Sequence, residues 1–327
     1  MFFAQRFSQR SVRWLGLLIT TIAIAFVVWS LYSSKLLTTD AWTDTHVMMG
    51  VILTALIFTA SLFFVFTAWH TIVMSVSEVR ISWIDGLYIY AISQIYKYIP
   101  SNIMHHVGRY YLLRERGVEH SAAGWGILAE TGLIIAASIV VALVFGAPLI
   151  RASILDVLQG SLIPLLAVVG AVFVVGCAAA LFLRAKRTEV RALIDPFLRR
   201  QVLIAGLKAL LLQVGGRILS GFALWWLASS LLDGNQPSMP DVTAIWSAAW
   251  LIGYLTPGAS AGLGVREAVI IGAFMALGVS LEGATLVALA FRVATILGDL
   301  FFAGIGYVAH RIGMIPALQH DVGSSGD

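Results

Sequence analysis

The chain has 327 residues, of which 59% are hydrophobic and 12% charged, and its formal net charge is +4. Soluble domains are about 45–50% apolar and about 25% charged, so this composition excludes a disordered chain and argues against a soluble enzyme. Apolar runs of about 20 residues, the length that crosses a bilayer, recur along the sequence. We therefore expect an all-α polytopic membrane protein.

The basic excess and the single cysteine fit this class. Lys and Arg collect in the cytoplasmic loops of membrane proteins, and no nucleic-acid-binding motif accompanies them here. Cys177 lies in an apolar run and has no partner for an intrachain disulfide. The sequence shows no His or Cys spacing typical of a metal site and no nucleotide, cofactor or hydrolase motif. We expect no metal, no cofactor and no enzymatic activity.

Six apolar runs are expected to cross the membrane in full. The first run begins beside three arginines and is too long for the apolar core of a signal peptide, so we expect it to be retained. The six predicted spans are Val12–Tyr32, Val47–Met74, Ala122–Leu143, Leu162–Leu183, Leu203–Leu231 and Thr285–Ala309.

Two further apolar stretches are interrupted by residues that break helices. Residues 81–113 contain Pro100 among polar and basic residues, and residues 242–277 contain Pro257 followed by a glycine-rich segment. Proline removes a backbone donor, and non-helical backbone at membrane depth is tolerated only inside protein or beside a water-filled cavity. Each stretch is therefore expected to form a broken, re-entrant helix hairpin, with two full spans as the alternative.

The distribution of Lys and Arg orients the predicted spans. With the N-terminus in the cytoplasm, basic residues collect in the inner segments 75–120 and 184–200. The outer loops, at residues 33–46, 147–160 and 232–241, carry at most one basic residue each. This distribution follows the positive-inside rule and places both termini in the cytoplasm.

The two interrupted stretches resemble each other. The segment YKYIPSNIMHHVGRYYL at residues 96–112 aligns with GYLTPGASAGLGVREAV at residues 253–269. One insertion further along aligns Glu130 with Arg292. Within the aligned segments, a proline and an arginine match at the same spacing: Pro100 with Pro257, and Arg109 with Arg266.

Each segment belongs to a unit made of a long span, a broken hairpin and a second span. The units have opposite orientations in the predicted topology, which is the inverted repeat common in secondary transporters. We place repeat 1 at about residues 47–146 and repeat 2 at about residues 203–309, within one membrane domain at residues 1–315. A polar tail, residues 316–327, follows and is expected to be disordered from Gln319.

Ionisable residues inside apolar segments are costly and mark candidate functional sites. Glu130 and Arg292 occupy the middle of the two aligned spans. They form either a structural ion pair or a pair that opens when an anion competes for the arginine. Arg217 follows two glycines, and it either contacts a headgroup or pairs with Asp299 or Glu267.

The glycine-rich break before Arg266 has the features of a phosphate site. A helix that starts there directs free N–H groups and the positive end of its dipole towards the break. Gly262 and Gly264 allow an anion to approach the backbone, and arginine geometry suits phosphate. Tight helix packing through the glycines is the alternative. Arg109 is the matching candidate in the first hairpin.

Three other polar or aromatic features receive structural interpretations. Lys97 lies among tyrosines and is expected to be a snorkelling lysine in an interfacial aromatic belt. His105 and His106 are adjacent, so we expect their side chains to diverge and not to hold a metal. The expected anchors near the outer side are Trp225, Trp226, Trp246 and Trp250.

The motif LTPGASAGLGVREA at residues 255–268 resembles the membrane-region family of lysylphosphatidylglycerol synthases, and KYIPSNIMHHVGRYYLLRERG at residues 97–117 resembles the family's first-half motif. The resemblance covers about residues 10–312. It implies a flippase-like membrane domain that moves an anionic or modified lipid between leaflets through a cavity between inverted halves. The matching positions are Pro100, Arg109, Glu130, Pro257, Gly262, Gly264, Arg266, Glu267 and Arg292.

The chain also departs from the family's pattern. Bifunctional members carry an aminoacyltransferase domain after the membrane region, and the short tail here leads us to expect no synthesis of lysyl-lipid. The first hairpin reads SNIMHH where members often have a more glycine-rich segment, which leaves the lipid substrate open.

We therefore expect a flippase-like lipid transporter of the bacterial inner membrane whose partner is an anionic phospholipid or a polyprenyl-phosphate-linked glycolipid. The small residues in several spans are compatible with a homodimer. Two alternatives are a small-anion or solute secondary transporter and a non-transporting membrane partner of a glycosyltransferase. The expected headgroup-binding residues are Arg109, Arg217, Arg266, Arg292, Gly262 and Gly264; the expected gating or charge-pairing residues are Glu130, Glu267 and Asp299; and Pro100 and Pro257 are the expected hairpin breaks.

Overall fold

The structure is a computed structural model. It describes residues 45–98, 103–160, 199–232, 234, 236–256 and 260–322, and the side chains of residues 147–160, 260 and 314–322 are not part of the description. The predicted spans Val12–Tyr32 and Leu162–Leu183 lie outside the described residues, and so do Pro100 and Pro257. We call the described residues before position 161 the first half and those after position 198 the second half.

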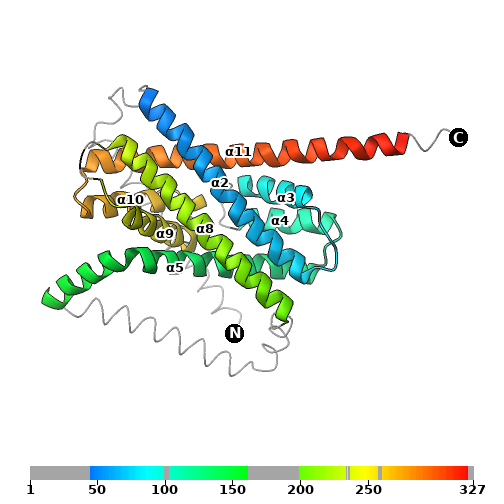
Figure 1. Cartoon of the computed structure of the whole chain (residues 1–327), viewed down its shortest axis with the longest axis horizontal. Helices are drawn as coiled ribbons and strands as arrows, with labels where there is room; N and C mark the ends of the chain where they lie inside the picture. The colour runs from blue at the N-terminus through cyan, green and yellow to red at the C-terminus, as the bar shows by residue number, and fades with distance from the viewer. Residues whose placement is uncertain are drawn as a thin grey trace, which may run out of the picture.

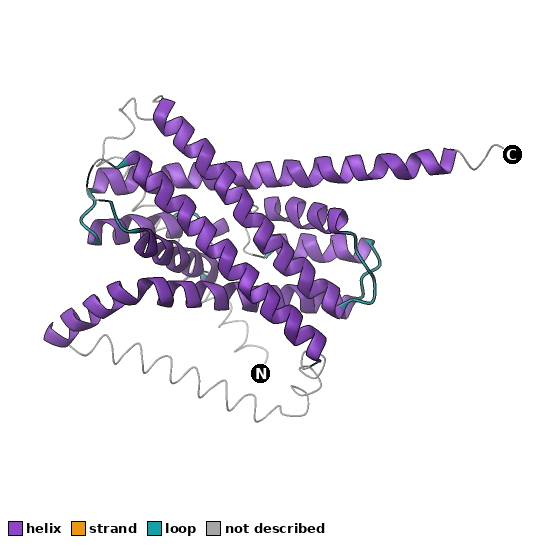
Figure 2. Ribbon diagram, viewed as in Figure 1, coloured by secondary structure: helices purple, strands orange, loops and turns teal. Residues whose placement is uncertain are grey.

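The described part of the chain consists of helices and loops and contains no strand (Figure 2). Four of its helices are long and apolar enough to cross a membrane, which confirms four of the six predicted spans by length and composition. These helices are α2 (Thr45–Val76), α5 (His120–Gly160), α8 (Arg200–Leu231) and α11 (Leu281–Val322).

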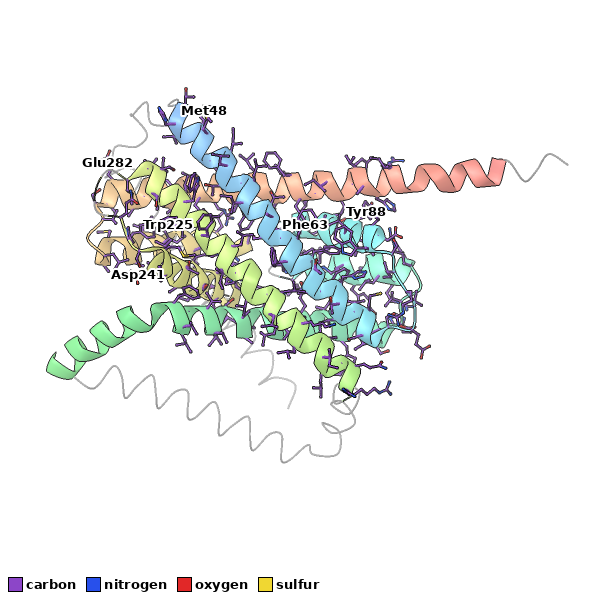
Figure 3. All side chains as sticks on the ribbon, viewed as in Figure 1. Met48, Phe63, Tyr88, Trp225, Asp241 and Glu282 are labelled. Atoms are coloured by element: carbon purple, nitrogen blue, oxygen red, sulfur yellow. The ribbon has the colours of Figure 1, made fainter. Side chains whose placement is uncertain are left out.

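The outer faces of the long helices expose large apolar side chains. Leu56 on α2 is 51% exposed and Leu211 on α8 is 64% exposed. Figure 3 shows Met48, also exposed, at the outer end of α2. Apolar side chains of this size on a surface made by apolar helices suit contact with lipid tails. The structure therefore supports a membrane protein.

Each interrupted stretch folds as a short helix, a break and a second short helix, as predicted. In the first half, α3 (Trp83–Ile95) and the 3₁₀ turn η3 (Tyr96–Tyr98) precede the break, and α4 (Met104–Glu115) follows it. In the second half, the corresponding elements are α9 (Met239–Leu255), the 3₁₀ turn η5 (Ser260–Gly262) and α10 (Val265–Ala276).

The first short helix of each half begins with the same cap. The Ser82 hydroxyl accepts a hydrogen bond from the Asp85 backbone N–H at 3.0 Å, and the Ser238 hydroxyl accepts one from the Asp241 backbone N–H at 3.3 Å. A serine in this position satisfies a backbone donor that has no partner within the helix. This shared Ser-x-x-Asp pattern is a second likeness between the halves, and the sequence comparison above missed it.

Helices of each half pack against helices of the other half. Helices α2 and α8 pack along each other and cross in front of the short helices (Figure 1). The last helix of each half then packs against the first short helix of the other half: α5 against α9, and α11 against α3. Edge-on ring contacts join Phe58 of α2, Trp246 of α9 and Phe291 of α11 across the core, with ring centroids 4.9–6.5 Å apart.

Two element boundaries were predicted wrongly. Helix α5 continues through Gly160, where a loop at residues 147–160 was expected, and α11 continues through Val322, past the predicted start of disorder at Gln319. In both cases the prediction placed the helix end where the apolar run ends. A fall in hydrophobicity does not end a helix by itself, because Ala, Leu, Gln and Arg all favour helical backbone.

Candidate functional site

A polar pocket lies among the short helices and three of the long ones. Every described element except α11 contributes to its wall, and its empty space, the open mouth included, measures about 900 Å³. A space of this size accommodates a polar group much larger than one water molecule. The wall brings together five of the predicted site residues: Arg109, Arg217, Arg266, Gly262 and Glu130.

Arg109 and Glu130 form an ion pair that we call the first-half pair. Arg109 on α4 is fully buried, and its Nη1 contacts Glu130 Oε2 on α5. Its Nε donates to Ser93 Oγ at 3.0 Å, and its guanidinium lies 3.8 Å from the centre of the Tyr90 ring. The Tyr90 hydroxyl donates to the other carboxylate oxygen of Glu130 at 2.8 Å. The carboxylate therefore holds Arg109 in the pocket wall, as a buried charge requires.

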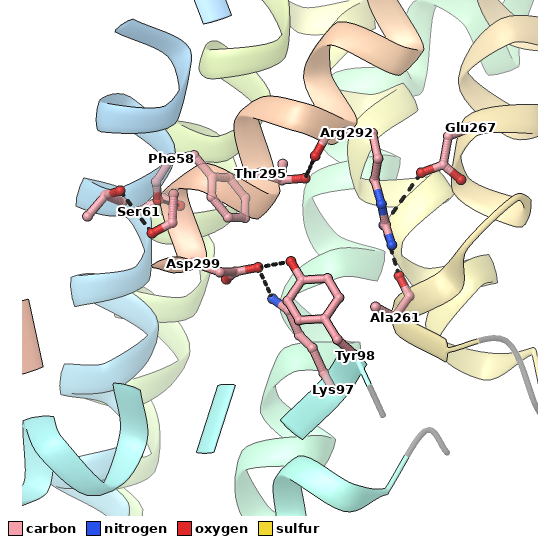
Figure 4. A network of polar contacts seen from close by, with 11 residues as sticks. Phe58, Ser61, Lys97, Tyr98, Ala261, Glu267, Arg292, Thr295 and Asp299 are labelled. Atoms are coloured by element: carbon pink, nitrogen blue, oxygen red, sulfur yellow. Dashed lines mark hydrogen bonds and ion pairs between the residues drawn. The ribbon is translucent and has the colours of Figure 1, made fainter. Parts of the chain in front are cut away.

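Arg292 pairs with Glu267 instead of Glu130, which corrects the predicted Glu130–Arg292 pair. The Glu267 Oε1 atom lies 3.5 Å from Arg292 Nη1, and the same nitrogen donates to the Ala261 carbonyl at 3.2 Å (Figure 4). We call Glu267 and Arg292 the second-half pair. The described residues that line the pocket wall do not include Arg292 or Glu267, so the pair lies behind the break.

The glycines of this break have different roles from those predicted. The Gly264 N–H donates to Glu267 Oε2 at 2.6 Å, so the protein's own carboxylate occupies the start of α10 where an external anion was expected. At Gly262, φ is +68°, and an added Cβ would lie 2.6 Å from Arg266 Nε. At Gly253, an added Cβ would lie 2.6 Å from Arg266 Cγ. Gly253 and Gly262 thus make room for the Arg266 side chain.

Lys97 and Asp299 form an ion pair between the halves, which we call the cross-half pair. Lys97 Nζ on η3 lies 2.6 Å from Asp299 Oδ2 on α11, and the Tyr98 hydroxyl donates to the same oxygen at 2.5 Å (Figure 4). Asp299 is buried, and its Oδ1 atom has no hydrogen-bond partner among the described residues. The prediction of a snorkelling Lys97 is therefore wrong, because a buried carboxylate holds its ammonium group.

Arg217 and Arg266 remain without a carboxylate, and we call them the unpaired arginines. Among the described residues, no Asp or Glu oxygen lies within 4 Å of either guanidinium, and the Nε atom of each is buried without a partner. The Arg217 guanidinium lies 4.1 Å from the centre of the Trp250 ring, and the Arg266 guanidinium lies 5.5 Å from the same centre. Arg217 is 7% exposed. The predicted pairing of Arg217 with Asp299 or Glu267 is wrong, because both carboxylates hold other cations.

The two histidines also line the pocket, and their rings contact each other at a tilt of 39°. The ring centroids of His105 and His106 are 3.9 Å apart, whereas diverging side chains were predicted. Both residues lie in the first turn of α4, where the Cα–Cβ bonds lean towards the start of the helix. His106 Nε2 lies 3.0 Å from the Tyr254 hydroxyl. Within the described part of the chain, no group of three His, Cys, Asp or Glu residues is placed to hold a metal.

Two tryptophans predicted to be interfacial anchors belong to the pocket. Trp246 is 3% exposed, and its Nε1 donates to Ser220 Oγ at 2.7 Å, which satisfies the polar end of a buried indole. Trp250 lies in the pocket wall beside the unpaired arginines. The aromatic faces give two positive charges a favourable environment without cancelling them.

A comparison with protein families finds a match that spans most of the chain. Residues 13–303 match the family model described as the lysylphosphatidylglycerol synthase TM region. The chain belongs to this family. A comparison with curated proteins finds no match. Family membership agrees with the resemblance inferred from the two motifs and supports a membrane protein with a role related to membrane lipids.

The family motifs contribute both to the pocket and to the layer behind it. In this member of the lysylphosphatidylglycerol synthase TM region family, the first motif supplies Arg109 and the second supplies Arg266 and Gly262 to the pocket wall. The second-half pair, also from motif positions, fixes the break from behind. Arg217 is outside both motifs, and its charge inside an apolar run after two glycines had left headgroup contact and an ion pair as alternatives.

Proposed function

We propose that the protein is a flippase-like transporter that moves an anionic phospholipid or a polyprenyl-phosphate-linked glycolipid between the leaflets of a bacterial inner membrane. The observation that carries the proposal is the presence of the two unpaired arginines at one pocket. An uncompensated buried charge such as Arg217 costs several kcal/mol, and Arg266, whose Nε is also buried, adds a second positive charge, so the pocket suits a ligand that supplies negative charge. No covalent bond forms or breaks in this process.

The surroundings of the pocket suit a lipid headgroup. The wall includes residues of α2, α5 and α8, which are candidate membrane spans. The same helices expose large apolar side chains on their outer faces, for example Leu56 on α2 and Leu128 on α5. In the proposed complex, the phosphate lies beside the unpaired arginines while the acyl or prenyl chain stays among these apolar side chains. Family membership supports the same lipid-related role.

The transport step is proposed to rely on two inverted halves. The reciprocal packing of α5 on α9 and of α11 on α3 supports an inverted repeat with broken, re-entrant hairpins, and the distribution of Lys and Arg supports both termini in the cytoplasm. The first-half pair and the second-half pair each join elements of one half, so rocking of the halves preserves them. The cross-half pair joins the halves, and its opening accompanies the change of exposure.

Reconstitution in liposomes tests the proposal. Fluorescently labelled phosphatidic acid in the inner leaflet becomes accessible to an external quencher when the protein moves it outwards. We expect wild-type protein and a Lys208→Gln variant, which changes an exposed lysine of α8, to move the lipid at similar rates. Arg217→Gln and Arg266→Gln are expected to slow the movement about tenfold or more, because each removes a charge-assisted hydrogen-bond donor. Equal rates in all four proteins would contradict the proposal.

A further inference from the structure

The charges around the pocket specify the charge of its ligand. We infer that the pocket selects a dianionic phosphate, which is a phosphate monoester or a diphosphate, over a phosphodiester with one negative charge. The inference rests on the proposed function and adds the chemical class of the headgroup to it.

The count of charged side chains is the first step. The pocket wall and the layer directly behind it contain five Lys or Arg side chains and three carboxylates within the described residues. Each carboxylate holds one cation, in the first-half, second-half and cross-half pairs. Two positive charges therefore remain, and both belong to side chains that line the same pocket.

The geometry places these two charges on one ligand. Both guanidinium groups lie within 5.5 Å of the centre of the Trp250 ring. The Gly253 and Gly262 backbones leave the space that the Arg266 side chain occupies beside this ring. Because both side chains lie against this ring and line the same pocket, we infer that one phosphate group or one diphosphate in the pocket contacts both guanidinium groups.

The donors of the unpaired arginines favour a ligand with several charged oxygens. The Arg217 side chain is more than nine-tenths buried, and its Nε has no acceptor among the described residues. Arg266 Nε is likewise buried and without an acceptor there. A phosphate monoester offers three terminal oxygens and about two negative charges, whereas a phosphodiester offers two oxygens and one charge. A monoanion leaves one buried guanidinium uncompensated, and this favours the dianion.

The described part of the pocket wall offers no free carboxylate to a positively charged headgroup. Glu130 is the one carboxylate of the wall within the described residues, and it already accepts hydrogen bonds from Tyr90 and Arg109. A zwitterionic headgroup that brings an ammonium group therefore finds no free carboxylate on the described wall. Selection by charge thus works against both monoanionic and zwitterionic lipids.

Competitive binding to the purified full chain tests this inference. The probes, used at pH 8 in detergent, are dioctanoyl phosphatidic acid as the monoester, dioctanoyl phosphatidylglycerol as the diester, and inorganic diphosphate as a water-soluble anion with at least two negative charges. Wild-type protein is expected to bind phosphatidic acid about tenfold or more tightly than phosphatidylglycerol. Arg217→Gln and Arg266→Gln each reduce this ratio to near one, Arg217→Lys keeps part of it, and Lys208→Gln keeps all of it.

The outcomes separate this inference from the proposed function. Equal affinity of the wild type for the two lipids would overturn the selection of a dianion and leave the lipid transporter standing. Binding of inorganic diphosphate without binding of either lipid would support the dianion and overturn the lipid as its source. Binding of none of the three probes would overturn both.

Discussion

The two halves of the molecule place an ion pair at the same point and reverse its polarity. In the first half, the second short helix supplies the arginine, Arg109, and the following long helix supplies the carboxylate. In the second half, the second short helix supplies the carboxylate, Glu267, and the following long helix supplies the arginine. In the alignment of the halves, Arg266 corresponds to Arg109, and Arg292 corresponds to the carboxylate partner of Arg109. Arg266 therefore has no carboxylate partner at this place. The departure from internal symmetry thus creates one of the two uncompensated positive charges of the pocket.

The largest effect is expected from breaking the first-half pair. Glu130→Gln leaves the fully buried Arg109 without its counter-charge, which costs about 3–5 kcal/mol of stability. Thermal unfolding in detergent measures this loss. The double variant Arg109→Leu, Glu130→Leu removes both charges and should recover most of it. A Glu130→Gln variant as stable as the wild type would show that the pair does not compensate Arg109.

The cross-half pair should be less sensitive, because Lys97 is 20% exposed at its side chain. Asp299→Asn leaves this lysine with access to the pocket, so we expect a loss of about 1–3 kcal/mol, the range of a broken charged hydrogen bond. The variant also removes the ion pair between the halves, so transport should become faster or less dependent on lipid concentration. Unfolding and liposome transport measured on the same preparation check both effects, and an unchanged transport curve would argue against a gating role.

The Gly262→Ala variant tests whether the second-half break makes room for the Arg266 side chain. The backbone φ of +68° and the approach of Arg266 Nε both oppose a Cβ, and we expect a loss of about 1–2 kcal/mol. The displaced Arg266 should also weaken lipid binding. Gly272→Ala is the matched control on α10, where an added Cβ meets nothing within 4 Å and helical propensity favours alanine. Similar binding by the two variants would contradict the role given to Gly262.

The smallest effects are expected at the two serine caps. Ser82→Ala and Ser238→Ala each remove one cap of a first short helix, at a cost of about 1 kcal/mol. Because both halves use the same cap, the two variants should lose similar stability in a denaturation series. A loss confined to one of them would indicate that the caps are not equivalent.

The elements were largely predictable from the sequence, because hydrophobic length and helix-breaking residues are local signals. Four predicted spans and both helix–break–helix stretches agree with the structure. The charge pairs were not predictable in the same way. The alignment of Glu130 with Arg292 identifies equivalent places in the two halves, and equivalent places need not touch. Lys97 and Asp299 are 202 positions apart and meet only because α11 packs on the first half.

The glycine-rich break shows a second limit of sequence reasoning. The residues Gly262, Gly264 and Arg266 were correctly identified as a special local structure. Their chemistry was assigned to an external phosphate, but the next residue, Glu267, occupies the backbone donor of Gly264. A carboxylate three positions after a glycine at the start of a helix is the local signal that predicts this cap.

The most direct test gives the ion pair of the second half the same polarity as the ion pair of the first half. The double variant Glu267→Gln, Arg292→Glu places a carboxylate on α11 at the position that aligns with Glu130, where Arg292 now contacts Glu267 and the Ala261 carbonyl at the break before Arg266. We expect the variant to fold and to bind phosphatidic acid about tenfold or more weakly than the wild type, because Arg266 is no longer free. Unchanged binding of phosphatidic acid by the folded variant would contradict the claim that the reversed pair creates the anion site.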